Sequence, residues 1–391
     1  MEINSKRVQQ QVRNFERTIN EYQFKEPFSR FLTQFYKNNR QMGSSDRRMN
    51  SRFCYNFFRL GKAFSDLELS EKLSIAEFLC EESSAVVQVF QPDWSDKINL
   101  TLEEKVSFIQ SKYGNFLDEV FPFSGFLSGS IHKTEFILSH FVQPNLYIRI
   151  QKGMEGKVKK ALEKNEIPFV ELSAQTLSLP NGTNLQQIKS LDGDYEVQDF
   201  SSQQSLNELE VVPRSSWWDC CAASGGKSLL LLDKEPNIKL LVSDVRLSIL
   251  RNLDERFEKA NVRTYFRKKI LDLSKPVDHI MGEESFDGII LDAPCSGSGT
   301  WGRTPEMLQK FTSSELQRFS DLQKQIAKHV VPFLKPGKTL LYITCSVFEA
   351  ENEEVSKYIS DTLGLQLVAQ QPIIGYDKKA DSMFVAKFVK V

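Results

Sequence analysis

Several features that would define a compartment or a partner at once are missing from this 391-residue sequence. It has no apolar signal region near residue 1 and no apolar run of membrane-spanning length, so we expect a cytoplasmic protein. It has no excess of basic residues, because its net charge is -1, and any contact with nucleic acid must come from local patches. Its four histidines share no motif, so nothing favours a Cys–His hydrolase.

The six cysteines show no zinc-binding spacing, and in a cytoplasmic chain they should stay reduced. Two of them lie where chemistry is expected. Cys295 follows the apolar run 286–292, and Cys345 follows a second apolar run, 339–344. Both runs are typical of buried strands, and ligands bind outside the carboxyl ends of strands in open α/β sheets. These two thiols are therefore candidates for covalent catalysis.

The chain changes character twice, which predicts three regions. Residues 1–124 have apolar residues at helical spacing. Residues 125–190 combine two short strands and a helix, which indicates a small α+β subdomain. In residues 191–391 strands and helices alternate, which predicts a mainly parallel, doubly wound sheet. The strands expected in that sheet are 217–221, 239–244, 264–266, 286–292 and 339–344, followed by a final pair, 365–369 and 383–389.

A loop rich in small residues, Asp219-Cys-Cys-Ala-Ala-Ser-Gly-Gly-Lys-Ser228, follows the first strand of this sheet and opens a leucine-rich helix. Small residues let a ligand approach the backbone, and a helix N-terminus favours a carboxylate or a phosphate. A P-loop needs glycine where Cys221 stands, so a nucleoside cofactor with a carboxylate fits better than a triphosphate. Asp244 ends the second strand, where an acidic residue takes a ribose hydroxyl pair, and Asp272 is placed to meet an adenine amino group.

The segment Gly297-Ser-Gly-Thr-Trp-Gly302 matches the dinucleotide fingerprint literally. It follows the fourth strand instead of the first, and the acidic partner is missing at the right distance, so we reject that interpretation. Its glycines are better explained as giving room beside Cys295 for a flat ring.

Together these motifs resemble the Sun (RsmB-type) RNA cytosine-5 methyltransferases, which use S-adenosylmethionine. The resemblance runs from about Pro144 to the end, and the first 120 residues more weakly resemble the NusB-like helical region of some members. It is most specific in residues 219–228, in 292–299 with Arg303-Thr-Pro-Glu306, and in 342–346 with Glu351-Asn-Glu353. It implies a Rossmann-like class I methyltransferase sheet with an antiparallel final strand. The cofactor-binding residues expected are Cys221, Ala222, Ala223, Ser224, Gly225, Gly226, Lys227, Asp244, Asp272 and Asp292.

The resemblance also implies catalytic roles. Cys345 matches the nucleophile that adds to carbon 6 of cytosine, and Cys295 matches the residue that helps release the product. Asp292 would hold or protonate ring nitrogen 3, and Lys227 would orient the target or the cofactor. A base in a duplex must be unstacked first, so we expect single-stranded or looped RNA, and ribosomal RNA by family analogy. The expected RNA contacts are Arg47, Arg48, Arg149 and Arg303.

Four positions depart from the family pattern, and none of them removes a catalytic group. Ser224 replaces a proline of the cofactor loop, and Ile249 replaces an arginine that follows the second strand. Gln151 replaces an asparagine, and Lys338 replaces a turn glycine. No metal site is expected, and the chain is expected to be a monomer. Two other interpretations share these motifs: a tRNA methyltransferase, and a catalytically silent RNA-binding assembly factor. Likewise, the arginines among the aromatic residues near the N-terminus could equally be a solvated helix face.

Overall fold

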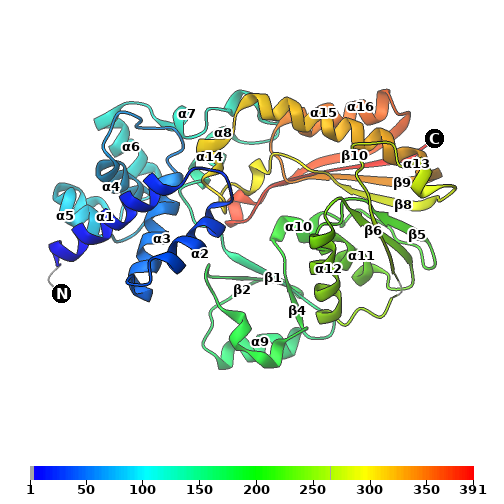
Figure 1. Cartoon of the computed structure of the whole chain (residues 1–391), viewed down its shortest axis with the longest axis horizontal. Coiled ribbons are helices and arrows are strands. Elements are labelled where there is room, and N and C mark those ends of the chain that lie inside the picture. Colours follow the sequence, from blue (N-terminus) through cyan, green and yellow to red (C-terminus); the bar gives the residue numbers. More distant parts are fainter. Residues whose placement is uncertain (1–3, 265) are drawn as a thin grey trace. The chain divides into compact units, whose positions relative to one another are not determined.

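The computed structural model describes residues 4–264 and 266–391, and it divides the chain into two compact units (Figure 1). The helical unit consists of the described residues up to 125 together with His132–Gln143 and Trp301–Thr312. The sheet unit consists of Phe126–Ile131, the described residues of Pro144–Thr300, and Ser313–Val391. The chain therefore enters the helical unit three times, and a segment that follows Cys295 belongs to it.

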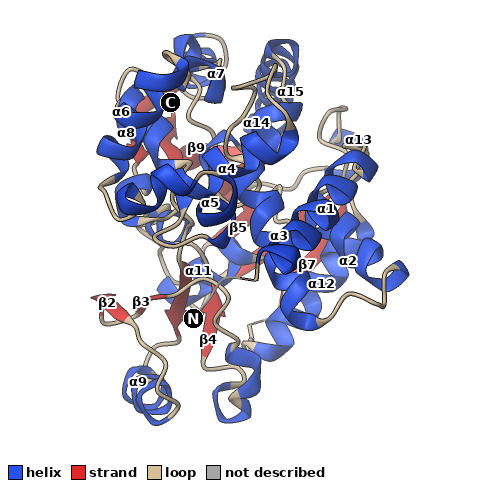
Figure 2. Cartoon of the chain, turned by 90° about the vertical axis from the view of Figure 1, so that its left-hand side faces the viewer, coloured by secondary structure: helices blue, strands red, loops and turns tan. Residues whose placement is uncertain are grey.

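All the elements of the helical unit that Figure 2 labels are helices. They close around aromatic side chains such as Phe15, Phe28, Phe53 and Trp94, which are at most 2% exposed. A capping box at Thr101, in which Thr101 and Glu104 bind each other's backbone N–H groups, starts α6. The α-helices of this unit are α1 (Ser5–Glu21), α2 (Phe28–Asn38), α3 (Ser44–Phe58), α4 (Leu69–Cys80), α5 (Ala85–Phe90), α6 (Leu102–Tyr113), α7 (Leu117–Val120), α8 (Lys133–Ser139) and α14 (Met307–Lys310).

The arginines that the sequence places among these aromatics do not form one solvated face. Arg59 is 1% exposed and donates hydrogen bonds to the carbonyl oxygens of His140 and Gly302, at 2.6 and 3.0 Å. Arg52 forms an ion pair with the buried carboxyl of Glu77. Both guanidinium groups therefore satisfy buried acceptors inside the unit.

The small subdomain is a four-stranded antiparallel sheet in the order β2-β3-β1-β4. Its strands are β1 (Leu146–Ile150), β2 (Val170–Ser173), β3 (Thr176–Leu179) and β4 (Tyr195–Val197). Helix α9 (Glu155–Lys164) packs Val158 and Leu162 against Ile148 and Ile150. The strands β3 and β4 were not expected, because each is four residues or shorter and is surrounded by turn-forming residues.

The large sheet has seven strands in the order β10-β11-β9-β8-β5-β6-β7. Neighbouring strands from β5 to β9 pair in parallel, and β11 lies antiparallel between β9 and β10. This order confirms the expected Rossmann-like sheet with an antiparallel final strand. The strands are β5 (Ser216–Asp219), β6 (Lys239–Asp244), β7 (Phe266–Ile270), β8 (Phe286–Asp292), β9 (Leu334–Thr344), β10 (Leu365–Ile373) and β11 (Met383–Lys390).

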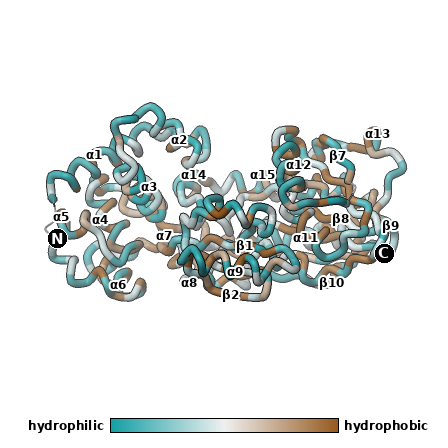
Figure 3. The backbone as a smooth tube through the Cα atoms, turned by 90° about the horizontal axis from the view of Figure 1, so that it is seen from below, coloured by the Kyte–Doolittle hydropathy of each residue, from teal (hydrophilic) through white to brown (hydrophobic). Residues whose placement is uncertain are grey.

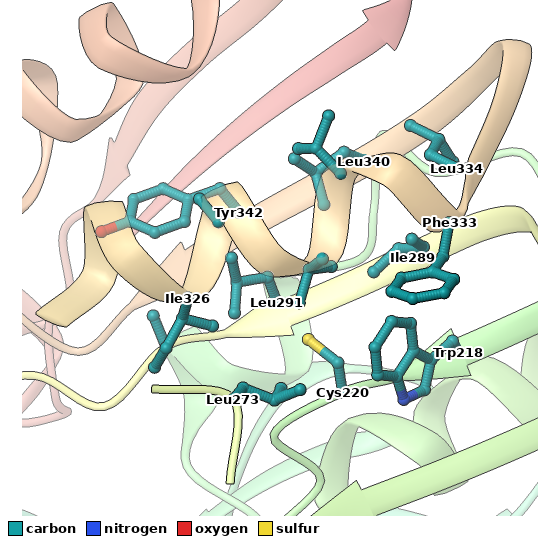
Figure 4. Close-up of a cluster of buried hydrophobic side chains, with 14 of the residues drawn as sticks. Trp218, Cys220, Leu273, Ile289, Leu291, Ile326, Phe333, Leu334, Leu340 and Tyr342 are labelled. Atoms are coloured by element: carbon teal, nitrogen blue, oxygen red, sulfur yellow. The ribbon is translucent and has the colours of Figure 1, made fainter. Parts of the chain in front are cut away.

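Helices cover both faces of this sheet (Figure 1). Helices α11 (Gly226–Lys234) and α12 (Leu247–Lys259), with the short α10 (Phe200–Gln204), lie on one side. On the other side α15 (Ser313–Val330) and α16 (Glu353–Asp361) pack on a core that includes Trp218, Leu291 and Tyr342 (Figure 4), and α13 (Asp278–Met281) follows β7. Figure 3 shows hydrophobic stretches within the sheet unit and mostly hydrophilic residues along α1 and α2.

Two strand ends differ from expectation at the edge where ligands would bind. The strand expected over 217–221 ends at Asp219, because Cys220 and Cys221 already turn into the following loop. The strand expected at 264–266 begins at Phe266, and residue 265 lies outside the described residues. No helix within residues 4–264 and 266–391 combines the length and the hydrophobicity of a membrane span.

Candidate active site

Cys295 and Cys345 lie just beyond the carboxyl ends of two neighbouring parallel strands. Strands β8 and β9 are in register with Asp292 beside Ile343, so the residues that follow each strand emerge side by side. The two Sγ atoms are 3.3 Å apart, and both cysteines are free thiols. The strand ends therefore bring together the two thiols that the sequence singled out.

The electrostatics of the pair keep Cys295 protonated. Its hydrogen bond with Cys345, burial, and the nearby charge of Glu351 raise the pKa of the Cys295 thiol well above its usual value. Cys295 is therefore a neutral thiol near pH 7, which can donate a proton or a hydrogen bond to a group beside it.

A cavity of about 560 Å³ opens beyond the carboxyl ends of β5, β6, β8 and β9. Both thiols line it, together with half of the ten residues expected to bind a cofactor. Apolar side chains such as Leu273, Leu322 and Ile326 form part of its wall. The expected cofactor residues in the lining are Cys221, Ala223, Asp244, Asp272 and Asp292. The other five expected residues lie in the loop after β5 and in the first turn of α11, and they are Ala222, Ser224, Gly225, Gly226 and Lys227.

The loop between β5 and α11 has the backbone that its sequence predicts. Ala223 and Gly225 have φ angles of 46° and 82°, in the left-handed region. A Cβ on Gly225 would lie 2.7 Å from the ring of Phe257, so the loop packs directly on α12. Ser224, which replaces the family proline, is 3.3 Å from the Arg256 guanidinium and is hydrogen-bonded to it.

Asp244 is held in place by four hydrogen bonds. It accepts one from the backbone N–H of Ala223 at 3.2 Å, one from the backbone N–H of Arg246 at 2.9 Å, and two from the Arg246 guanidinium at 3.1 and 3.4 Å. Asp272, by contrast, accepts from the Ser274 hydroxyl at 2.6 Å, and this bond lowers the pKa of Asp272 despite partial burial. The Asp272 carboxyl group thus stands ionised at the cavity.

Lys227 connects the loop to the catalytic side of the cavity. Its Nζ atom lies 3.2 Å from Oδ2 of Asp292 and 2.9 Å from Oγ of Ser202, and the residue is 7% exposed. This pairing neutralises two charges that the cavity would otherwise bury singly. The role expected of Lys227, orienting the target or the cofactor, stays a prediction.

Asp219 is a buried carboxyl that the sequence did not single out. Burial raises the pKa of Asp219 to about 7, and the Ser228 hydroxyl donates to its Oδ2 atom at 2.5 Å. No sequence signal distinguishes it from the ordinary aspartate that ends a strand.

The structure does not support the RNA contact expected of Arg149. Arg149 is 5% exposed, and its guanidinium pairs with Asp233 and donates to Gln198 at 2.8 Å. A guanidinium satisfied in this way ties β1 to the elements around α11 instead of facing a phosphate backbone.

The other three expected RNA contacts belong to the helical unit. Arg48 is exposed, whereas Arg47 is half-buried and donates to the carbonyl oxygen of Met42 at 2.8 Å. Arg303 is also half-buried. Their role stays a prediction. Among the described residues, no cluster of three or more His, Cys, Asp or Glu side chains is arranged to hold a metal ion.

Comparison with known proteins finds relatives of the part of the chain that carries this site. Residues 207–379 match the family model of the 16S rRNA methyltransferases RsmB/F. A ribosomal RNA small subunit methyltransferase B from Shewanella oneidensis is 34% identical over 178 residues, which are 45% of this chain and 41% of that protein. One from Xylella fastidiosa is 31% identical over 212 residues, 51% and 49% of the respective chains. The chain thus spans less than half the length of these curated relatives.

Solved structures confirm the fold over a longer stretch. The crystal structure of PH0851 matches with a TM-score of 0.73 at 18% identity, over 100% of both chains. NSun6 from Pyrococcus horikoshii with SFG matches with a TM-score of 0.61 at 16% identity, over 69% of this chain and 97% of that one. The family match, the strand order and the paired thiols agree, and residues 207–379 of this chain are similar to the RsmB/F family of methyltransferases.

Proposed function

We propose that this protein transfers a methyl group from S-adenosylmethionine to carbon 5 of a cytosine in ribosomal RNA, through a covalent bond between Cys345 and the base. The observation that carries the proposal is the pair of thiols 3.3 Å apart at a cavity that also holds Asp292. The ribosomal substrate rests on the names of the family and of the partial relatives.

The residues of the cavity fit the cofactor. A volume of about 560 Å³ lies within the range of ligand pockets, and the walls are mostly apolar with a few carboxylates. Asp244 would bind the ribose hydroxyls and Asp272 the adenine amino group, while the N-terminus of α11 at Gly226 favours the carboxylate. When bound, S-adenosylmethionine supplies an electrophilic methyl group on a sulfonium.

Carbon 5 of cytosine is a poor nucleophile, and Cys345 overcomes this. Its thiolate adds to carbon 6, and the new carbon–sulfur bond turns the ring into an enamine-like nucleophile at carbon 5. The negative charge that develops on the ring spreads to nitrogen 3, where Asp292 in its protonated form would donate a hydrogen bond or deliver its proton. Lys227, 3.2 Å from Asp292, holds that carboxyl in position.

Release requires that a base, for which solvent water serves, takes the proton on carbon 5. When that proton leaves, the electron pair reforms the double bond between carbons 5 and 6, and Cys345 departs as a thiolate. The neutral Cys295 thiol lies beside the departing sulfur, so it can stabilise that thiolate by a hydrogen bond or by a proton. This geometry supports a role for Cys295 in release and not in attack.

Bisulfite sequencing of total RNA from cells with and without the gene tests the proposal. We expect one cytosine, in ribosomal RNA, to lose its methyl mark without the gene and to regain it on complementation. Complementation with Cys345→Ala should leave the mark absent. If no cytosine changes in any RNA, the chain is not this methyltransferase, and the assembly-factor interpretation takes its place.

A further inference from the structure

Glu351 is a fully buried carboxyl group that lies between the two cysteine loops. It ends a short 3-10 helix, Glu349–Glu351, between β9 and α16. One of its oxygens accepts the backbone N–H of Ser296 at 2.7 Å, and the other accepts the hydroxyls of Ser296 and Ser346, both at 2.5 Å. Ser296 follows Cys295 and Ser346 follows Cys345. A single side chain therefore binds the residue next to each thiol.

A third element joins this network. Gln323 of α15, also fully buried, donates from its side-chain amide to Glu351 at 3.1 Å and to the carbonyl oxygen of Pro294 at 3.0 Å. The hydroxyl of Tyr342 donates to the backbone carbonyl of Glu351 at 2.6 Å. Glu351 is thus fixed from β9 and from α15, and it transmits that fixed position to the residues on both sides of Cys295.

Burying the Glu351 carboxyl group costs desolvation free energy, which argues that this side chain does more than fill space. The partners of the Glu351 carboxyl are two hydroxyls, a side-chain amide and a backbone N–H, and none of these carries a charge. Burial raises the pKa of Glu351, and only these hydrogen bonds oppose that rise. Apolar residues could fill the same volume with less desolvation. What they could not do is bind three donors from the two cysteine loops and a fourth from α15 at once.

We propose that Glu351 is a positioning residue that holds the loops of Cys295 and Cys345 together, so that the Cys295 thiol stays beside the sulfur of Cys345. The inference rests on the proposed function for the meaning of the two thiols, but the placement of the thiols can be measured without cofactor or RNA. Glu351 touches neither substrate nor cofactor in this role and acts through Ser296 and Ser346.

Disulfide cross-linking measures that placement. Diamide oxidises two adjacent thiols to a disulfide and is itself reduced to a hydrazine, and peptide mapping shows whether Cys295 has joined Cys345. In Glu351→Ala the loops lose their common anchor, and in Glu351→Asp the side chain is too short to reach both. We expect either change to slow cross-linking by about tenfold to a hundredfold, since a displacement of 1 Å weakens proximity effects on that scale.

The conservative variant should behave differently. In Glu351→Gln the carbonyl oxygen keeps the Ser296 N–H and Gln323 bonds, and the amide donates to the two serine hydroxyls, which rotate to accept. We expect cross-linking at or above the wild-type rate, because the charge that raises the pKa of Cys295 is gone. Recovery by glutamine but not by aspartate distinguishes a bridge between loops from simple loss of a carboxyl group.

Glu77→Ala is the matched control, because Glu77 is equally buried and hydrogen-bonded but belongs to the helical unit. It should lower stability and leave cross-linking unchanged. If Glu351→Ala and Glu351→Asp are folded and cross-link at the wild-type rate, the positioning role is wrong. If Glu351→Ala does not fold, Glu351→Asp and Glu351→Gln still decide the question. If cross-linking changes as expected while the wild-type protein methylates no RNA, the proposed function fails and the positioning role stands.

Discussion

The backbone N–H of Gly299 donates a hydrogen bond to the carbonyl oxygen of Cys345, with nitrogen and oxygen 2.9 Å apart. The carbonyl oxygen of Gly299 in turn accepts the N–H of Ser382, also at 2.9 Å. A Cβ at Gly299 would lie 2.0 Å from the Ser382 oxygen and 3.1 Å from the Cys345 oxygen. The loop that carries Cys295 can therefore lie against the loop of Cys345 and the start of β11 only with glycine at this position.

Gly299→Ala should disturb the site because the added methyl group has no space. We expect a loss of about 1–3 kcal/mol in the free energy of unfolding, the usual range for overpacking, together with slower methyl transfer. Urea unfolding and a methyl-transfer assay on the target RNA measure the two effects. Gly129→Ala is the control, since a Cβ there meets nothing within 4 Å. Equal stability of the two variants would contradict the close approach.

Substitution of each of the two cysteines should impair a different step of methyl transfer. Cys345→Ala removes the sulfur that attacks the base, so we expect no methyl transfer and no protein–RNA adduct. Cys295→Ala leaves the attack intact but impairs release, so a covalent protein–RNA complex should accumulate and survive denaturing electrophoresis. Cys80→Ala, in the helical unit, should turn over normally. An adduct that persists in Cys345→Ala would show that another residue attacks the base.

Asp244→Ala should weaken cofactor binding more than it weakens the fold. The carboxylate is 8% exposed on its side chain and is oriented by Ala223 and Arg246. Two lost hydrogen bonds from a charged group correspond to about 3–6 kcal/mol at most, so we expect an increase in Kd of about a hundredfold or more. Titration calorimetry with S-adenosylmethionine measures it. Asp254→Asn, an exposed partner of Lys268, should bind the cofactor normally; a wild-type Kd in Asp244→Ala would remove Asp244 from the cofactor site.

Asp219 should make stability depend on pH between about 4 and 7. Because burial raises its pKa to about 7, the folded protein binds a proton on Asp219 that the unfolded chain releases near its ordinary pKa of 3.8. Its contribution to stability is complete below the unfolded pKa and is lost as pH rises through the folded one.

Asp219→Asn removes that proton equilibrium and keeps an acceptor for Ser228. Between pH 4 and 7 the wild-type free energy of unfolding should therefore fall relative to the variant by up to about 1.4 kcal/mol per pH unit. Urea unfolding at several pH values, followed by the fluorescence of the adjacent Trp217 and Trp218, gives the comparison. Parallel pH profiles for the two proteins would mean that Asp219 is ionised in the folded state throughout.

The sequence predicts the thiol pair and the sheet because both depend on local pattern. The apolar runs before Cys295 and Cys345 are strands of a parallel sheet, and parallel strands end at one edge. In the sequence, Glu351 is only one residue of a motif within an acidic run. Its contacts with Ser296 and Ser346 depend on how three loops fold together. No spacing rule relates those positions.

The role of Arg149 could not be predicted from its local sequence. A basic residue in a strand next to the proposed methyltransferase domain is a reasonable phosphate contact, but its environment decides its role. Asp233 and Gln198, 84 and 49 residues away along the chain, occupy its guanidinium. Short strands such as β4 escaped prediction for a related reason: pairing with β1 stabilises them, whereas their own three residues carry no pattern.

The segment Trp301–Thr312 belongs to the helical unit, although it lies between two elements of the sheet unit in the sequence. Trp301 is 1% exposed, and its ring lies 6.0 Å from that of Phe121 and 5.0 Å from that of Phe311. The helical unit therefore cannot be added or deleted as one continuous segment. A cut near residue 125 would leave part of its interior, the segment around Trp301, between β8 and α15. A sheet unit prepared without the helical unit would need a redesigned 301–312 segment to stay soluble, because that segment would expose its buried aromatic side chains.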